Sequence, residues 1–560
     1  MATVPLGSPT GRWVMASVIM ASAMAFIDST ALNVVLPSLQ RDLNASGTDL
    51  FWILNAYLLI LAALILVGGS LGDKLGRKKI FMTGILIFII GSTACGFAPT
   101  VTYLIGFRLT QGVGGALMIP GSLSLLSSSI DEKERGKAIG TWSAITTVVT
   151  IGGPVIGGAL ADAGLWRYIF FINVPIGLAA LLILQRHVAE SRGEDNNPVS
   201  TNPTNPVSAN PIHPGSTTPN NPTPTDPNAT TPNKPNPTRP TNPSLDFPGA
   251  IAIALGLASL TFGFLRIPAL GLNNWIVYLT LGLGILLLIL FIGIESKSRQ
   301  PMMPLHLFAN KTFSGANLLT FFLYAGLGAG MLFLSLNLVQ AQGYSQLESG
   351  LTFLPFTVLM ITIARLSGSL ADKFGPRLIL ILGPATTGAG LLLLSFVGAT
   401  RGAKDYWTTF FPGILIFGLG MSFTVAPLTT TVMKSVVDEF SGTASGINNA
   451  VSRIASVFAN AIFGTLAILF FSGSLQKTLP QNLKDNPIIL QQAANLGNAK
   501  PPPSITGADR KTVTVAYRSA FIDAYSKLMR CAAILAFLGS AMAILLITKR
   551  HTPVQHAPNQ

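Results

Sequence analysis

The chain has 560 residues, of which 49% are hydrophobic and only 10% are charged, and 36 Lys and Arg against 22 Asp and Glu give it a net charge of +14. A soluble domain carries roughly 25% charged residues, so this composition excludes an ordinary soluble protein and favours one whose apolar side chains face lipid. The cations stand in short clusters between long apolar runs, which excludes the clustered basic face of a nucleic-acid-binding protein.

Residue types that support catalysis or metal binding are sparse. The two cysteines, Cys95 and Cys531, both fall in apolar runs and indicate no disulfide framework. The histidines lie in loops, in tails or at the ends of apolar runs, with no metal-ligand spacing. The sequence contains no G-x-x-x-x-G-K-[ST] string, which a phosphate-binding loop would need. We therefore expect no metal, no cofactor, no direct use of ATP and no enzymatic activity.

In chain order, apolar runs of about twenty residues recur, and each is long enough to cross a bilayer as a helix. They predict spanning helices at roughly 14–36, 51–71, 80–98, 101–125, 138–160, 168–185, 249–266, 275–294, 313–338, 349–371, 378–397, 406–428, 443–471 and 527–548. The chain is thus predicted to be an all-α polytopic membrane protein with about fourteen transmembrane helices. An even number of spans places both termini on one side of the membrane.

The positions of the cations decide which side that is, because Lys and Arg are enriched in cytoplasmic loops. Clusters occupy the predicted connections at 74–79, 133–137, 297–311 and 373–377, and the C-terminal end at 549–550. These segments all fall on the side of the N-terminus, so both termini are predicted to be cytoplasmic, in an inner or plasma membrane. The same orientation places tryptophans at external ends of spans, where an aromatic belt is expected: Trp52, Trp166, Trp275 and Trp407.

Two stretches interrupt the pattern of spans. Residues 191–248 are dominated by Asn, Pro and Thr, and they offer few apolar side chains to offset the entropy lost on ordering, so a disordered cytoplasmic linker is predicted. Residues 472–526 form a long external connection with three consecutive prolines from Pro501 to Pro503. Whether this connection folds over the external face is left open by the sequence.

A short glycine-rich string occurs twice. Gly69 to Arg77 reads G-S-L-G-D-K-L-G-R, and Gly368 to Arg377 reads G-S-L-A-D-K-F-G-P-R. Both copies follow an apolar span, and both fall in predicted cytoplasmic connections. Such a repeat indicates two halves of parallel topology, related by an axis along the membrane normal, as in transporters built of two bundles.

Further strings stand at the expected places in other spans. Ile27 to Pro37 reads I-D-S-T-A-L-N-V-V-L-P, Leu104 to Pro120 reads L-I-G-F-R-L-T-Q-G-V-G-G-A-L-M-I-P, Gly153 to Gly158 reads G-P-V-I-G-G, and Trp166 to Pro175 reads W-R-Y-I-F-F-I-N-V-P. With the string from Gly69 to Lys79, these closely resemble the signature loop, fourth-helix motif and fifth-helix antiporter motif of the major facilitator superfamily. The first and last strings resemble its fourteen-span drug:proton antiporter branch.

The resemblance implies a fold of two six-helix bundles around a central cavity, with two extra helices between them. On this basis the chain divides into an N-terminal bundle at 1–190, the linker at 191–248, two extra helices at 249–300, a C-terminal bundle at 301–548 that contains the external connection 472–526, and a cytoplasmic tail at 549–560.

Two ionisable residues stand deep in predicted spans: Asp28 in the first and Arg108 in the fourth. A charge in hydrocarbon is costly and is a functional candidate by default, with structural pairing inside the bundle as the alternative. Burial and a nearby cation both change the affinity of a carboxylate for a proton. We therefore assign Asp28 and Arg108 to proton coupling.

The resemblance assigns two more groups of residues. A gating motif on the cytoplasmic side, expected to act as a conformational latch, comprises Gly69, Asp73, Gly76, Arg77, Asp372 and Arg377. An antiporter motif, in which glycines permit close helix packing, comprises Gly140, Gly153, Pro154, Gly157 and Gly158, with Val149 at a position where the family usually has glycine. Polar residues that either line the substrate cavity or bond between helices are Asn33, Asn55, Gln111 and Asn317.

The function implied by the resemblance is proton-coupled antiport, with export of lipophilic neutral or monocationic small molecules by alternating access. One carboxylate neutralises one charge, so export of dications is not expected. The alternative is a proton-coupled exporter or importer of one specific metabolite on the same fold. Expected partners are a small-molecule substrate, the proton and the lipid bilayer. A periplasmic adaptor protein is left open, and no nucleic acid is expected.

Overall fold

The computed structural model describes residues 3–190, 246–298, 301–437, 440–484 and 486–548. Side chains at positions 73, 143, 144, 147, 151, 364, 365 and 372 are outside this description. The predicted tail at 549–560, and the predicted linker apart from residues 246–248, therefore lie outside the described residues. The regular elements that the structure describes are all helices, apart from one isolated β-bridge between Val4 and Ile130. The expectation of an all-α polytopic membrane protein is confirmed.

The first unit, within residues 3–190, contains helices α1 to α7. Their bounds are α1 Pro9–Asp42, α2 Gly47–Leu75, α3 Arg77–Phe97, α4 Val101–Ser129, α5 Glu132–Asp162, α6 Tyr168–Phe171 and α7 Asn173–His187. Ser8 caps α1, and Ser46 forms a capping box with Asp49 at the start of α2, so side chains satisfy N–H groups that have no partner within the helix. The short α6 and α7 together form one span.

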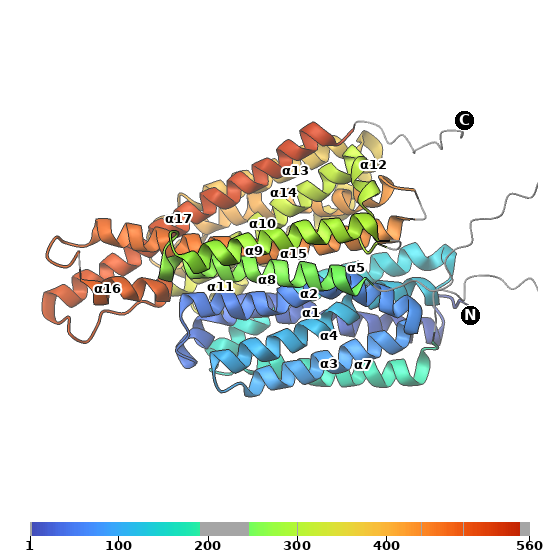
Figure 1. Cartoon of the computed structure of the whole chain (residues 1–560), viewed down its shortest axis with the longest axis horizontal. Coiled ribbons are helices and arrows are strands. Elements are labelled where there is room, and N and C mark those ends of the chain that lie inside the picture. The colour runs from blue at the N-terminus through green and yellow to red at the C-terminus, as the bar shows by residue number, and fades with distance from the viewer. Residues whose placement is uncertain (1–2, 191–245, 299–300, 438–439, 485, 549–560) are drawn as a thin grey trace, which may run out of the picture.

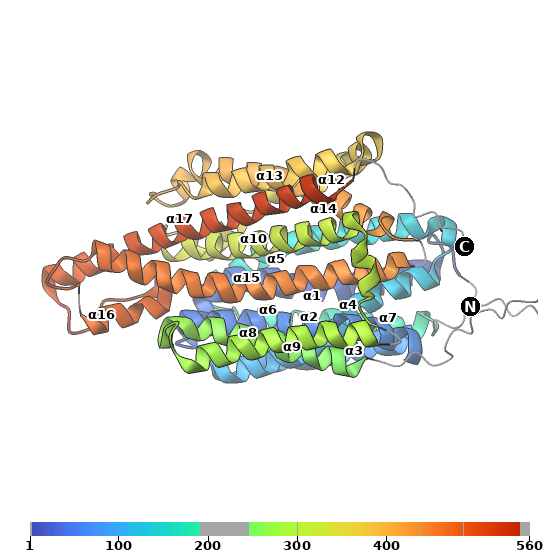
Figure 2. The same cartoon turned by 45° about the horizontal axis from the view of Figure 1, so that its top comes forward.

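The two extra helices are α8, Phe247–Leu270, and α9, Trp275–Lys297. They pack against each other closely, since a Cβ at Gly284 would lie 2.5 Å from the Leu260 side chain. Figure 2 shows the pair beside α2 and α15, and the Thr465 hydroxyl of α15 donates to the Phe264 carbonyl of α8 at 2.6 Å. The pair thus covers a boundary between the first unit and the second.

The second unit, within residues 301–548, contains the remaining elements. These are η2 Leu305–Ala309, α10 Lys311–Gln340, α11 Gln346–Leu351, α12 Leu354–Phe374, α13 Pro376–Leu394, η3 Ala403–Thr408, α14 Phe410–Lys434, α15 Ser441–Thr478, α16 Pro487–Gln491, η5 Gln492–Asn498 and α17 Gly507–Leu546. The span expected at 349–371 is divided into α11 and α12. Figure 1 shows that α1 begins and α17 ends at the same end of the molecule, which we call the terminal face, and the opposite end is the distal face.

Thirteen of the described helices are long and apolar enough to cross a membrane. The remaining long helix is α5, whose apolar part, Val148–Asp162, is shorter. The described residues thus contain thirteen helices that qualify as spans, against the fourteen predicted, and α5 stands at the place of the remaining one. Trp275 and Trp407 are 69% and 67% exposed, as expected of an aromatic belt. Trp166 instead is buried and donates its indole N–H to Asp42 at 2.6 Å, because its ring packs between helix ends.

The connection expected at 472–526 is shorter than predicted, since α15 continues to Thr478 and α17 already begins at Gly507. At about 1.5 Å per residue both helices are roughly twice as long as the hydrocarbon core is thick, and their ends project from the distal face in Figure 1. Helix formation continues beyond the apolar runs because the two ends bury rings against each other, as Phe471 does against Tyr517 and Phe521.

Within the remaining connection, the described residues that include Ala494 and Asn495 fold back over the first unit. Gln40 of α1 donates to the Asn495 carbonyl at 3.1 Å, and a Cβ at Gly47 would lie 2.6 Å from the Ala494 carbonyl oxygen. The sequence left this point open, and the structure shows that the connection covers the distal ends of α1 and α2.

Candidate functional site

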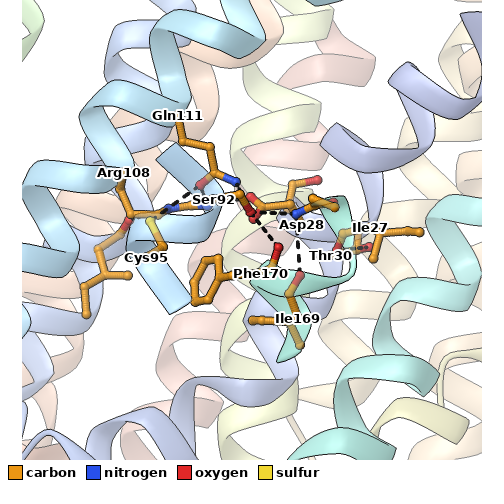
Figure 3. A network of polar contacts seen from close by, with 12 residues as sticks. Ile27, Asp28, Thr30, Ser92, Cys95, Arg108, Gln111, Ile169 and Phe170 are labelled. Atoms are coloured by element: carbon orange, nitrogen blue, oxygen red, sulfur yellow. Dashed lines mark hydrogen bonds and ion pairs between the residues drawn. The ribbon is translucent and has the colours of Figure 1, made fainter. Parts of the chain in front are cut away.

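A buried polar cluster lies inside the first unit, centred on Asp28 of α1 (Figure 3). The Arg108 guanidinium of α4 contacts one Asp28 oxygen at 2.5 Å, and the Gln111 amide of α4 donates to the other at 2.8 Å. Arg108 also donates to Gln111 Oε1 at 2.8 Å. Asp28 and Gln111 are fully buried, and Arg108 is 1% exposed. The cluster therefore holds one carboxylate and one cation out of reach of solvent.

Helix geometry explains how the two α4 residues act together. Arg108 and Gln111 are three residues apart, which puts them on the same face of the helix. Glycines bring neighbouring helices close to α4. A Cβ at Gly91 of α3 would lie 2.8 Å from the backbone nitrogen of Gln111, and a Cβ at Gly112 of α4 would lie 2.8 Å from the Tyr57 carbonyl oxygen of α2. The Arg108 guanidinium stacks over the Tyr57 ring at 4.6 Å, which adds a cation–π contact.

A second layer of polar residues was missed by the sequence analysis. Ser92 of α3 donates to the Phe170 carbonyl at 2.9 Å and accepts from Gln111 at 3.4 Å. Asn173 of α7 donates to the same hydroxyl at 2.9 Å. Both are buried, and they fix the orientation of Gln111, which in turn binds Asp28. The available signal was the polarity of Ser92 and Asn173 within otherwise apolar runs.

The remaining cavity candidates do not gather around this cluster. Asn55 of α2 is fully buried, and its side-chain amide has no hydrogen-bond partner among the described residues. Asn317 of α10 accepts a hydrogen bond from Asn448 of α15 at 3.1 Å, inside the second unit. Asn33 of α1 uses its carbonyl oxygen to accept from Ser335 of α10 at 3.4 Å. Only Gln111 among these candidates contacts Asp28.

Another cation escaped the sequence analysis. Arg453 stands within α15 in the predicted span 443–471, and its Nε atom is buried without a hydrogen-bond partner among the described residues. An arginine inside an apolar run was the available signal.

The two copies of the repeated string form the same kind of turn. Gly76, between α2 and α3, has φ of 113°, and Gly375, between α12 and α13, has φ of 85°, a region that favours glycine. The Glu190 carboxylate accepts the backbone N–H groups of Lys78 and Lys79 at 2.9 and 3.0 Å. The positive end of the α3 dipole and the cations Arg77, Lys78 and Lys79 lie together there, and the Glu190 carboxylate offsets part of this positive charge.

The structure describes the contacts of some of the other residues assigned to the gating motif. Arg377 donates to the Ile544 carbonyl of α17 at 2.6 Å, which ties the second turn to the last helix. A Cβ at Gly69 would make only ordinary contact with Pro120. Arg77 is the first residue of α3. The side chains of Asp73 and Asp372 lie outside the described residues.

The antiporter glycines bring α5 against two helices. A Cβ at Gly153 would overlap the Thr30 hydroxyl of α1, and one at Gly157 would lie 2.8 Å from the Ala31 carbonyl oxygen. On the other side, a Cβ at Gly158 would lie 2.4 Å from the Gln346 carbonyl oxygen of α11. A Cβ at Gly140 has no neighbour within 4 Å, so close packing does not extend to that position.

Hydrogen bonds also join the two units near the distal face. Asp162, at the end of α5, accepts the backbone N–H groups of Gln346 and Leu347 at 2.9 Å each. The Gln346 side chain donates to Ser38 of α1 at 2.7 Å, and Gln340 of α10 donates to Gln40 of α1 at 2.9 Å. We call this set of contacts, together with Gly158, the distal seam. The distal seam closes the boundary between the units at the distal face.

Comparison with known proteins identifies the architecture. The family model described as Major Facilitator Superfamily matches residues 18–460. The chain is 28% identical to the Tetracenomycin C resistance and export protein of Streptomyces glaucescens, covering 96% of this chain and 91% of the relative. It is 27% identical to the Methyl viologen resistance protein SmvA of Salmonella typhimurium, covering 89% and 91%.

A solved structure agrees in fold. An inward-facing, occupied bacterial homologue of the human lysosomal transporter Spinster superposes with a TM-score of 0.63 at 16% identity, covering 96% of this chain and 97% of the other. At this identity the match concerns the fold alone.

Proposed function

The chain belongs to the Major Facilitator Superfamily, and on that premise we propose that it is a proton-coupled antiporter that exports lipophilic neutral or monocationic small molecules by alternating access. The observation that carries the proposal is the buried pair of Asp28 and Arg108, which are 0% and 1% exposed. Burying a carboxylate within a membrane span costs free energy that packing alone does not recover, which supports a functional role for Asp28. The resistance and export proteins among the relatives support the direction of transport.

A proton would change the cluster in a defined way. The ionised Asp28 balances the charge of Arg108 and accepts the Gln111 amide. A protonated carboxyl group keeps a hydrogen bond to Gln111 but no longer neutralises Arg108, and an unpaired buried cation is costly. Protonation therefore weakens the link between α1 and α4 and favours a rearrangement of these helices.

The packing of α5 offers a route from the cluster to the distal seam. Gly153 and Gly157 lie against Thr30 and Ala31, which directly follow the Asp28 turn of α1. The next residue, Gly158, lies against Gln346 of the second unit. A displacement of α1 would thus move α5 and change the contact between the two units. Coupling of this kind needs a rigid element that adopts two discrete arrangements, and α5 is the candidate for it.

We place the protein in an inner or plasma membrane with the terminal face, and both termini, in the cytoplasm. The cation clusters of the sequence support this orientation. With the distal face outside, the closed distal seam corresponds to the state that receives cargo from the cytoplasm. External protons reach Asp28 after the seam opens.

The cluster restricts the charge of the cargo. Both Asp28 oxygens already have partners in this conformation, so a monocation competes with Arg108 as well as with the proton. A dication would retain one unpaired charge in a low-dielectric site, at a cost of roughly several kcal/mol. Neutral lipophilic compounds avoid both costs, so we expect them to be exported best.

Export or import of one specific metabolite is the second candidate function. The polar group formed by Asn317, Thr320 and Asn448 in the second unit would suit a hydrogen-bonding cargo. A growth-inhibition panel in an efflux-deficient host separates the two, because protection against a single compound class would favour the second function.

The decisive experiment uses purified protein in proteoliposomes with an imposed pH gradient. Ethidium as a monocation, chloramphenicol as a neutral compound and methyl viologen as a dication serve as cargo. The wild type should transport the first two, and Asp28→Asn should abolish the pH-gradient-driven component. Undiminished transport by Asp28→Asn would move proton coupling to another residue.

Two variants control for folding. Asp28→Asn leaves Arg108 unpaired, which costs about 3–5 kcal/mol when a buried pair is broken, whereas Asp28→Asn with Arg108→Gln removes both charges and should fold better while remaining uncoupled. Asp405→Asn is the matched control, because Asp405 pairs on the surface with Arg401, which is 86% exposed. Such a pair contributes little, so coupling should be unchanged.

A further inference from the structure

A groove lies near the distal face between α17 and the end of α13, which Figure 1 and Figure 2 show side by side. Its volume is about 610 Å³. It is lined on one side by residues that follow α13, among them Phe396, and on the other by successive turns of α17 that carry Arg518, Asp523 and Arg530. The groove is separate from the Asp28 cluster, which lies in the first unit.

Hydrogen bonds place the groove where helices leave the membrane. Arg518 donates to the carbonyl groups of Ala341, just beyond α10, and Thr400, beyond α13. Trp407, on η3 in the same connection as Thr400, is 67% exposed, and exposed tryptophans of membrane proteins lie at the level of lipid headgroups. Further along α17, inside its apolar run, Ile534 is 57% exposed and faces the surroundings that lipid chains occupy.

The charges in the groove are not balanced. Asp523 pairs with Lys527 at 2.6 Å and also accepts a hydrogen bond from Ser474. Arg518 donates to neutral carbonyl groups, and the Arg530 guanidinium lies over the Phe396 ring at 5.7 Å from its centroid. The Asp523 carboxylate interacts electrostatically with Arg530 as well as with Lys527, so among the described residues one carboxylate faces three cations, Arg518, Lys527 and Arg530, and the groove keeps an excess of positive charge.

An arginine at the lipid boundary is stable only when it reaches polar partners, and phosphate is the anion present at that level. Its guanidinium binds phosphate oxygens in a paired geometry. A zwitterionic headgroup would add a further cation beside Arg530, whereas an anionic headgroup would reduce the excess positive charge. The exposed apolar surface around Phe396, which is 67% exposed, and Ile534 would receive the acyl chains.

We propose that this groove binds an anionic phospholipid of the leaflet at the distal face, with its phosphate at Arg530 and its chains along α13 and α17. The proposal is independent of what the protein transports. It assigns a ligand to the second unit, in which the lipid would tighten the contact between α13 and α17.

Native mass spectrometry of the purified protein, titrated with phosphatidylglycerol or phosphatidylcholine, tests the proposal. The wild type should bind at least one phosphatidylglycerol in preference to phosphatidylcholine. Arg530→Gln should weaken that binding about tenfold, the loss expected for a charge-assisted hydrogen bond, and Arg530→Lys should retain most of it. Arg530 is exposed and makes no hydrogen bond within the described residues, so its replacement should leave folding intact.

Arg510→Gln is the matched control, since Arg510 lies on the same helix, is exposed, and does not line the groove. Glycerol 3-phosphate in excess should not displace the lipid, because it lacks acyl chains. Equal binding of the two lipids by the wild type, unchanged binding by Arg530→Gln combined with Arg518→Gln, or displacement by glycerol 3-phosphate would each overturn the proposal.

Discussion

Gly158 of α5 and Gln346 of α11 are in backbone contact across the boundary between the two units, where a Cβ at position 158 would lie 2.4 Å from the Gln346 carbonyl oxygen. The contact is reciprocal, because a Cβ at Gly350 of α11 would lie 2.4 Å from the Pro154 carbonyl oxygen of α5. Only glycine permits backbones to approach in this way. The distal seam therefore depends on these two positions.

Gly158→Leu should force α5 and α11 apart and favour the state that is open at the distal face. Overpacking costs about 1–3 kcal/mol, which changes a two-state ratio about 5- to 150-fold. Spin labels at Leu165 and Leu351 should report a longer distance, and transport should fall at least severalfold. Gly140→Leu is the control on the same helix, since a Cβ there has no neighbour within 4 Å. An unchanged distance in Gly158→Leu would show that the seam is not held by this contact.

Asp73→Asn should slow transport severalfold without a matching loss of substrate affinity. The gating turn at Gly76 lies between α2 and α3 and is held by Glu190, away from the Asp28 cluster. A latch changes the balance between states and not the binding site. Turnover in proteoliposomes and equilibrium binding to the purified variant separate the two effects. An affinity that falls in parallel with turnover would contradict the latch role.

Deletion of residues 198–243 should leave expression and export largely intact. The segment is rich in Asn, Pro and Thr and offers too little apolar surface to build a core. Growth protection in the efflux-deficient host measures the effect, with membrane insertion checked on the same cells. Complete loss of protection with normal insertion would reveal a function of the linker.

Cysteine labelling should place the distal face outside the cell. In a Cys531→Ser background, Leu165→Cys, at a position 46% exposed, should react with an impermeant maleimide on intact cells. Lys133→Cys, near the start of α5 on the terminal face, should react only after permeabilisation. The buried Cys95 should stay silent in both conditions. The reverse pattern would invert the orientation and with it the direction of export.

The sequence alone was enough to predict an all-α polytopic membrane protein and to single out Asp28 and Arg108, which the structure brings into contact. Apolar length and a charge within an apolar run are properties of a single segment, so no contact has to be known. The repeated glycine turn was also visible, because Gly76 and Gly375 stand at equivalent places in both copies.

Tertiary structure decided which of these segments meet. Helices that are apolar on every side give no sequence signal for their rotation about the axis, so the contact of Gln111 with Ser92 and Asp28, and the hydrogen bond between Asn317 and Asn448, could not be predicted. The early start of α17 at Gly507 likewise depends on rings of α15 that bury its polar extension. Partners far apart in sequence, such as Gly158 and Gln346, are determined by packing, which only the folded chain defines.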